Sequence, residues 1–224
     1  MSGLRRNLKP AILAGLCVLV IAGSATWIYR TQFAAPPFQV QLHRAVGQVM
    51  AEQTARLLGN QGKIVIISIE ATKTPELKVQ IEEFQAALKQ LGTVQVAKTY
   101  YLETEGKTKY GVGSGLSARR FVRIVNKNLE ADAYVSFVGA PEFSEEELKE
   151  LKKTPKLVAE SRSADKMSKV FQQKILQTAV VSRFAFPAPV EGKPHTTREW
   201  FDKHFQIVTG ENFQALLGGT PTDK

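Results

Sequence analysis

Cysteine is almost absent from this chain of 224 residues: Cys17 is the only one, and it lies near the amino terminus. The rest of the chain therefore has no disulfide, no thiolate nucleophile and no cysteine metal ligand. Histidine is scarce too. His43, His195 and His204 are the only three, and none is spaced with a carboxylate as a metal-binding pair on a helix. No Gly-x-Ser-x-Gly elbow follows a strand. We therefore expect no metal, no cofactor and no enzymatic activity.

A basic stripe interleaved with aromatic residues is also missing. The net charge is +9, but Arg5, Arg6, Lys9 and Arg30 account for four of these charges, and the remaining +5 is dispersed among acidic residues. We therefore expect no nucleic-acid partner, whereas a moderately basic exterior suits anionic lipid headgroups.

Charge is absent from residues 11–29, which are mostly apolar. A helix of this length rises ~28 Å, close to the thickness of a bilayer's hydrocarbon core. Trp27 and Tyr29 stand at one end, where aromatic rings favour the membrane interface, and the excess of basic residues before the span places the amino terminus inside. We predict a single-pass signal anchor over residues 1–30 in the inner (cytoplasmic) membrane. The rest of the chain is then periplasmic or otherwise outside the cytoplasm.

The same segment can be interpreted as a cleaved signal peptide. Its basic start, its apolar stretch and the small residues Gly23-Ser24-Ala25 fit such a signal. The apolar character continues through Ile28, and this favours the uncleaved anchor. Both interpretations send the rest of the chain out of the cytoplasm.

Beyond the span, composition predicts a linker over residues 31–38, one domain over residues 39–212 and a flexible tail over residues 213–224. Residues 64–69 form a mainly β-branched run with one serine, Ser68, and such a run is typical of a strand buried on both faces. The predicted strands cover residues 64–69, 94–102, 133–138, 156–161 and 179–184. The predicted helices cover residues 39–58, 74–91, 117–129, a short segment after Ser144, 164–175 and 196–208.

Strands that alternate with helices favour right-handed crossovers and a three-layer α/β fold around a parallel sheet. The expected strand order is 2-1-3-4-5. Thr74, Ser117, Ser144 and Thr196 are predicted to cap the helices that they precede. The predicted fold class is thus α/β, with one amino-terminal transmembrane helix.

Two stretches of the domain resemble type 1 periplasmic sugar-binding proteins. Residues 47–69 read as a helix, a Gly-Lys turn and an apolar strand, and Glu83-Phe-Gln-Ala-Ala-Leu-Lys89 is similar to a pattern on the helix that follows in that family. The likeness covers roughly residues 47–186 and is greatest to the second lobe. It implies the fold of that lobe. Members bind ligands in a cleft between two lobes, and this chain has length for one.

Candidate ligand-binding residues follow from the expected sheet. Open parallel sheets bind ligands at the carboxyl ends of their strands, near the point where the strand order reverses. Ordinary solvated loops are the alternative interpretation of this rim. The candidates there are Glu70, Thr72, Gly139, Glu142, Ser161 and Arg162.

A second group of residues is predicted to meet protein partners. Gly15 and Gly23 permit close approach of another helix to the span, and Trp27 marks its end. Trp200 and Phe205 give an aromatic face to the last predicted helix. The alternatives are that the span is a plain tether and that this helix packs on the sheet.

Two functions from different classes follow. The first is a membrane-anchored, non-catalytic accessory or interaction subunit outside the cytoplasm, built on a single lobe, with the lipid bilayer and membrane proteins as partners. The second is a solute-binding or sensing protein that takes a small, polar, sugar-like ligand at the carboxyl ends of the strands.

Overall fold

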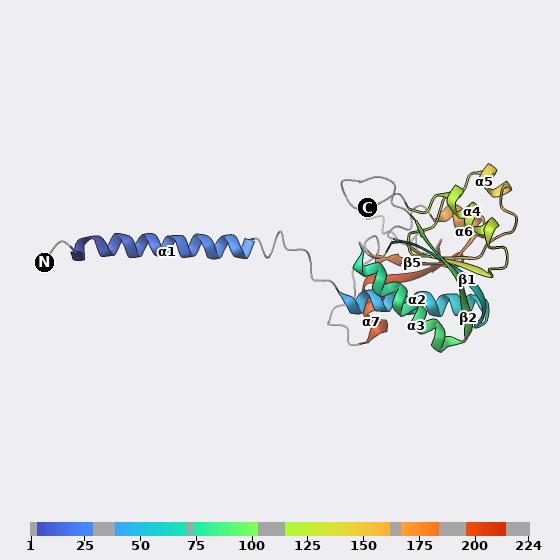
Figure 1. The fold of residues 1–224 in the computed structure, drawn as a ribbon, viewed down its shortest axis with the longest axis horizontal. Helices are drawn as coiled ribbons and strands as arrows, with labels where there is room; N and C mark the ends of the chain where they lie inside the picture. Colours follow the sequence, from blue (N-terminus) through green and yellow to red (C-terminus); the bar gives the residue numbers. More distant parts are fainter. Residues whose placement is uncertain are drawn as a thin grey trace, which may run out of the picture. The chain divides into compact units, whose positions relative to one another are not determined.

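A computed structural model describes residues 4–28, 39–70, 74–102, 115–161, 167–183 and 196–213 of the chain. The chain divides into two compact units, Met1–Phe38 and Gln39–Lys224 (Figure 1).

The first unit holds helix α1, Leu4–Ile28. Its side chains are described from residue 14 onward, and all of these are exposed. Leu19 is 73% exposed, and Ile21 and Trp27 are each 68% exposed. Within the described part of the chain, no helix combines the length and the apolar character that crossing a membrane requires. The structure therefore does not support the predicted transmembrane helix.

The second unit is built on a six-stranded mixed sheet in the order β2-β1-β3-β4-β5-β6. The first five strands are parallel, and β6 is antiparallel to β5. The α/β class and the predicted order 2-1-3-4-5 are confirmed, with one strand added at the edge. The strands are β1 (Gln61–Ile69), β2 (Thr93–Leu102), β3 (Ala133–Ser136), β4 (Leu157–Ser161), β5 (Leu176–Ser182) and β6 (Phe205–Thr209).

Helices cover both faces of this sheet (Figure 1). One face carries α2 (Val40–Leu58), α3 (Pro75–Leu91) and α7 (Thr197–His204), and the other carries α4 (Ala118–Lys127), α5 (Glu145–Lys149) and α6 (Ser168–Gln172). The side chains of β1 explain this arrangement. Ile64 and Ile66 join the core under α2 and α3, whereas Val65 and Ile67 join the core under α4. All four are 0% exposed, as predicted for a strand buried on both faces.

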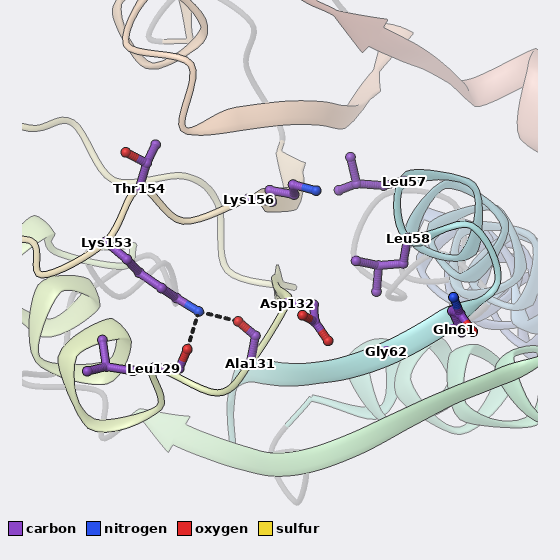
Figure 2. A pocket seen from close by; sticks show the side chains of 10 residues that line it. All are labelled: Leu57, Leu58, Gln61, Gly62, Leu129, Ala131, Asp132, Lys153, Thr154 and Lys156. Atoms are coloured by element: carbon purple, nitrogen blue, oxygen red, sulfur yellow. Dashed lines mark hydrogen bonds between the residues drawn. The ribbon is translucent and has the colours of Figure 1, made fainter.

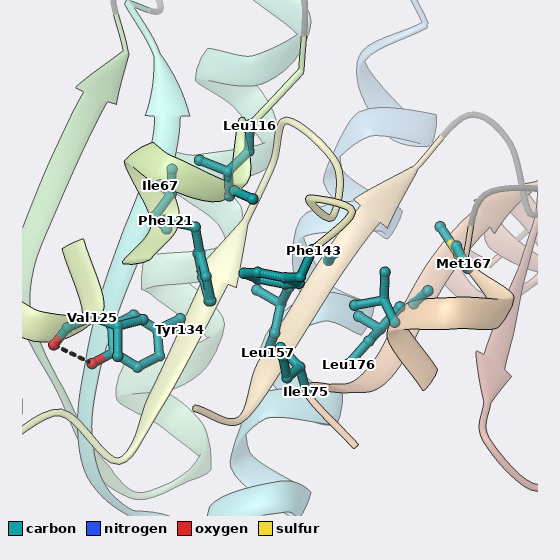
Figure 3. Close-up of a cluster of buried hydrophobic side chains, with 14 of the residues drawn as sticks. Ile67, Leu116, Phe121, Val125, Tyr134, Phe143, Leu157, Met167, Ile175 and Leu176 are labelled. Atoms are coloured by element: carbon teal, nitrogen blue, oxygen red, sulfur yellow. Dashed lines mark hydrogen bonds between the residues drawn. The ribbon is translucent and has the colours of Figure 1, made fainter. Parts of the chain in front are cut away.

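One buried hydroxyl organises the core under α4 (Figure 3). Tyr134 of β3 is fully buried, and its hydroxyl donates to the carbonyl oxygens of Asn128 at 2.7 Å and Val125 at 3.4 Å. The Asn128 amide in turn donates to the Tyr100 hydroxyl of β2 at 2.9 Å. Burial raises the pKa of Tyr134, so its hydroxyl keeps its proton and remains a donor. These bonds fix the end of α4 against β3 and β2.

The carboxyl-terminal part of the domain differs from the helix that the sequence predicts there. The helix predicted over residues 196–208 ends at His204, and Phe205–Thr209 pairs with β5 as a strand. Phe205 and Ile207 face the core under α2, whereas Val208 faces the core under α6. This alternation is that of a strand, and β5 supplies its hydrogen-bond partners.

The helix starts are also only partly as predicted. Ser144 forms the predicted capping box with Glu147, and the Thr196 hydroxyl accepts a hydrogen bond from the Glu199 N–H at 3.2 Å. Thr74 and Ser117 make no side-chain cap bond. The helix predicted over residues 164–175 extends too far at its carboxyl end: α6 ends at Gln172, Lys174 has a φ of +58°, and β5 begins at Leu176. Residues 162–166 lie outside the described part.

Helices α2 and α3 approach each other closely at Gly47. A Cβ atom at this position would stand well within 3.0 Å of the Gln80 carbonyl oxygen and at 3.1 Å from the Glu83 Cβ. The carbonyl belongs to the backbone of α3, so it cannot turn aside as a side chain would. The absent side chain at Gly47 therefore sets the distance between the two helices.

We predict that Gly47→Ala destabilises the domain. Helix propensity alone favours alanine over glycine by about 1 kcal/mol. We expect the opposite, a loss of about 1–3 kcal/mol in the free energy of unfolding, because the added methyl overpacks the contact with α3. Urea denaturation of the full chain in mild detergent measures this. The adjacent Gln48→Ala is the control and should change the value by about 0.5 kcal/mol or less. A Gly47→Ala variant as stable as the parent would contradict the close approach.

Candidate functional site

The carboxyl ends of β1, β3 and β4 lie side by side along one edge of the sheet, which we term the carboxyl edge. The strand order reverses at β1, because β2 and β3 lie on its two sides. Open α/β sheets bind ligands at such a point. Helix α3 begins at this edge because it follows β1. Helix α2 also begins there, since it precedes β1 and runs antiparallel to it.

Four of the six predicted ligand-binding residues come to this edge. Glu70 follows β1, Gly139 and Glu142 follow β3, and Ser161 ends β4. Both carboxylates are exposed, whereas Gly139 and Ser161 are half-buried. The described edge thus offers two carboxylates in the segments after β1 and β3, and a hydroxyl at the end of β4. The other two predicted residues, Thr72 and Arg162, lie outside the described residues.

The turn after β3 is held by hydrogen bonds, and this positions Glu142. The Ser136 hydroxyl donates to the Gly139 carbonyl oxygen at 2.6 Å and accepts from the Val138 N–H at 3.3 Å. Gly139 has a φ of +92°, which a residue with a Cβ adopts only under strain. Glu142 then stands exposed between two buried neighbours, Pro141 and Phe143. A carboxylate on so firmly anchored a segment is well placed to accept hydrogen bonds from a ligand.

A polar cluster between α2 and α3 lies toward the same edge and was missed by the sequence reasoning. Gln80 is 3% exposed, and its Nε2 lies 3.3 Å from the His43 Nδ1. The Gln80 Oε1 is buried without a hydrogen-bond partner. Burial lowers the pKa of His43, and the charge of Glu76 partly opposes that shift. His43 and Gln80 are 37 residues apart, so no local pattern could have revealed the pair.

The chemistry at the carboxyl edge is that of hydrogen bonding. The described residues hold no group of three or more His, Cys, Asp or Glu side chains that could bind a metal ion. Carboxylates and hydroxyls suit the hydroxyl groups of a polar ligand.

At the opposite, amino edge of the sheet, a hollow of about 640 Å³ opens between α2, β1 and the loops before β3 and β4 (Figure 2).

The residues predicted to meet partners fall into two groups. In α1, Trp27 is exposed, and nothing within 4 Å would obstruct a Cβ at Gly15 or Gly23. In the second unit, Trp200 is half-buried and stacks on His204 at a centroid distance of 6.2 Å. Phe205 is only 9% exposed and lies in β6, so it belongs to the core and offers little surface to a partner.

No protein-family model and no curated protein sequence matches the chain. Solved structures do match its fold. AraP, an arabinose-binding protein from Geobacillus stearothermophilus, is similar with a TM-score of 0.52 and 14% identity, over 78% of this chain and 63% of AraP. A solute-binding protein from Burkholderia graminis in complex with D-arabinose is similar with a TM-score of 0.53 and 16% identity, over 77% of this chain and 61% of that protein. The XylFII–LytSN complex contains a chain that is similar with a TM-score of 0.50 and 11% identity, over 75% of this chain and 60% of that chain.

The second unit has a type 1 periplasmic-binding-protein-like fold. The resemblance found in the sequence is thereby confirmed at the level of the fold. The chain spans only about six-tenths of the length of these neighbours. The neighbours are binding proteins by description, which agrees at this coarse level with the expectation of a non-catalytic chain.

We predict that His43→Gln flattens the pH dependence of stability. Because burial lowers the pKa of His43 below 6.5, the unfolded chain takes up the proton more readily than the folded one. The free energy of unfolding should therefore be highest above pH ~7 and fall as the pH drops through ~6.5. Urea denaturation of the full chain at a series of pH values measures this slope.

His204 is the internal comparison for this prediction. Burial and the adjacent Lys203 also lower the pKa of His204, so it contributes to the slope with the same sign. His43→Gln should remove one part of the slope, and the double variant with His204→Gln should remove more. A slope unchanged by His43→Gln would show that this histidine is not buried against Gln80.

Proposed function

We propose that the second unit is a solute-binding or sensing lobe that takes a small, polar, sugar-like ligand at its carboxyl edge. The observation that carries this proposal is that Glu70 follows β1, Glu142 lies in the loop after β3 and Ser161 ends β4, on three adjacent parallel strands near the reversal of strand order. The shared fold with an arabinose-binding protein and with a protein in complex with D-arabinose supports it.

The ligand chemistry follows from the groups at this edge. The carboxylates of Glu70 and Glu142 accept hydrogen bonds from sugar hydroxyls, and such charge-assisted bonds are stronger than neutral ones. Ser161 can both donate and accept. Nothing lies within 4 Å of the position of a Cβ at Gly139, so the turn leaves open space beside its backbone.

A second surface completes the site in this proposal. One rim buries too little of a small ligand, since good sites cover most of the ligand surface. The chain spans 63% of AraP and 61% of the Burkholderia protein, and a second copy or another protein is the proposed source of the second surface. The XylFII–LytSN complex supports the idea that a protein of this fold can assemble with a partner.

Titration of the full chain in mild detergent tests the proposal. We expect D-arabinose to bind saturably but weakly, with a dissociation constant of about 1 mM, because a single rim covers only part of the ligand surface. Glu142→Gln should weaken binding about tenfold or more, since it removes a charged acceptor. Glu150→Gln, at the far end of α5, is the matched control and should leave the affinity unchanged. A panel of pentoses and hexoses without saturable binding would refute the proposal.

A second candidate function is a membrane-anchored accessory or interaction subunit outside the cytoplasm. The observation that favours it is α1, whose described side chains at Leu16, Val18, Leu19, Val20 and Ile21 are apolar and 59–73% exposed. Exposed apolar side chains gain by burial in lipid or against other apolar helices. Gly15 and Gly23 would then allow a partner helix to approach closely.

Alkaline carbonate extraction of membranes tests this second candidate. We expect the chain to stay in the membrane fraction with Met1 still attached. A variant with Leu19→Glu and Ile21→Glu should move to the soluble fraction, because two carboxylates at the centre of the helix oppose insertion by several kcal/mol. Amino-terminal sequencing that begins at Thr26 would instead indicate a cleaved signal peptide and refute the anchor.

A further inference from the structure

We propose that the hollow at the amino edge of the sheet is a second binding site, for a free amino acid with an apolar side chain. The site lies at the opposite edge from the proposed sugar site and does not depend on it. Its volume of about 640 Å³ falls within the usual range for small-molecule sites. It is lined by Leu57, Leu58, Gln61, Gly62, Leu129, Ala131, Asp132, Lys153, Thr154 and Lys156 (Figure 2).

A fixed carboxylate stands in this hollow. The Asp132 Oδ2 accepts a hydrogen bond from the Lys63 N–H at 2.7 Å, and the Asp132 N–H donates to the Lys63 carbonyl at 2.7 Å. Gly62 makes room for this arrangement: its φ is +132°, and a Cβ there would lie 2.8 Å from the Oδ2. One carboxylate oxygen is thus held by the backbone, and the other is left for a ligand.

Two lysines line the same hollow, and they differ in whether the ammonium group already has hydrogen-bond partners. The Lys153 ammonium donates to the Leu129 carbonyl oxygen at 2.7 Å and to the Ala131 carbonyl oxygen, so two of its three protons are engaged. It also lies 5.6 Å from the centre of the Tyr134 ring. Lys156 is exposed and forms no ion pair within the described part of the chain. Lys156 is therefore the cation that remains for a ligand.

The apolar part of the wall comes from three leucines. Leu57 and Leu58 end α2 and are half-buried, and Leu129 is 45% exposed beyond the end of α4. Figure 2 shows Leu57 and Leu58 on one side of Asp132 and Lys153 on the other. A small ligand that reaches both sides meets an apolar surface together with the charged groups.

The combination of charges selects the ligand class. A simple anion would be attracted by Lys156 but repelled by the carboxylate of Asp132. A simple cation would be attracted by Asp132 but repelled by Lys156. A zwitterion satisfies both, with its ammonium on Asp132 and its carboxylate on Lys156. The three leucines then favour an aliphatic side chain. L-Leucine has all three features.

Titration of the full chain in mild detergent with L-leucine is the experiment, with 4-methylpentanoate and 3-methylbutylamine as the two half-ligands. We expect saturable binding of leucine, about tenfold or more tighter than of either half-ligand. Binding of 4-methylpentanoate or the amine as tight as that of leucine would overturn the zwitterion assignment. No saturable binding of leucine would overturn the site.

Substitutions locate the binding. Lys156→Met keeps the aliphatic stem, and Asp132→Asn keeps an oxygen that can accept from Lys63, so each should fold while weakening leucine binding about tenfold or more. Lys152→Met, at an exposed lysine outside the hollow, should have no effect. Unchanged affinity in both Lys156→Met and Asp132→Asn would refute this location. Glu142→Gln should leave leucine binding intact, which separates this site from the sugar site.

Discussion

The burial of β1 on both faces is the constraint on which the rest of the domain depends. Residues 64–67 are 0% exposed, and their side chains alternate between two separate cores. Both faces of the sheet must then be covered by helices, and parallel strands need such helices as crossovers. With both faces occupied, only the edges of the sheet and the loops remain for function. Both candidate sites accordingly lie at an edge of the sheet, one at the carboxyl edge and one at the amino edge.

The two edges differ because the helices run antiparallel to the parallel strands. Helices α3 and α4 begin toward the carboxyl edge, where the positive ends of their dipoles favour anions such as Glu70 and Glu142. They end toward the amino edge, where carbonyl groups without helical partners need donors. Asn128 donates to the carbonyl oxygens of Ile124 and Val125 in the last turn of α4, and Lys153 donates to those of Leu129 and Ala131 in the loop that follows. Glu70 and Glu142 thus lie at one edge, whereas Lys153 and Lys156 lie at the other together with Asp132.

Part of the candidate site could be predicted from the chain alone. Glu70, Gly139, Glu142 and Ser161 follow strands, and the rule that parallel strands share an edge brings them together without knowledge of any side-chain contact. The pair His43–Gln80 could not be found in this way. It depends on how closely α2 approaches α3 at Gly47, and that distance is set by packing between residues far apart in the sequence.

The sequence by itself determined the elements with strong periodicity: the doubly buried β1, the amphipathic α2 and α3, and the parallel order of the first five strands. These follow from local patterns and from the handedness of crossovers. Only the tertiary structure decided that Phe205–Thr209 is a strand, because so short a segment takes the conformation that its neighbour β5 can pair with. Only the tertiary structure likewise brought Asp132 and Lys156 into one hollow with the end of α2, since three separate segments of the chain meet there.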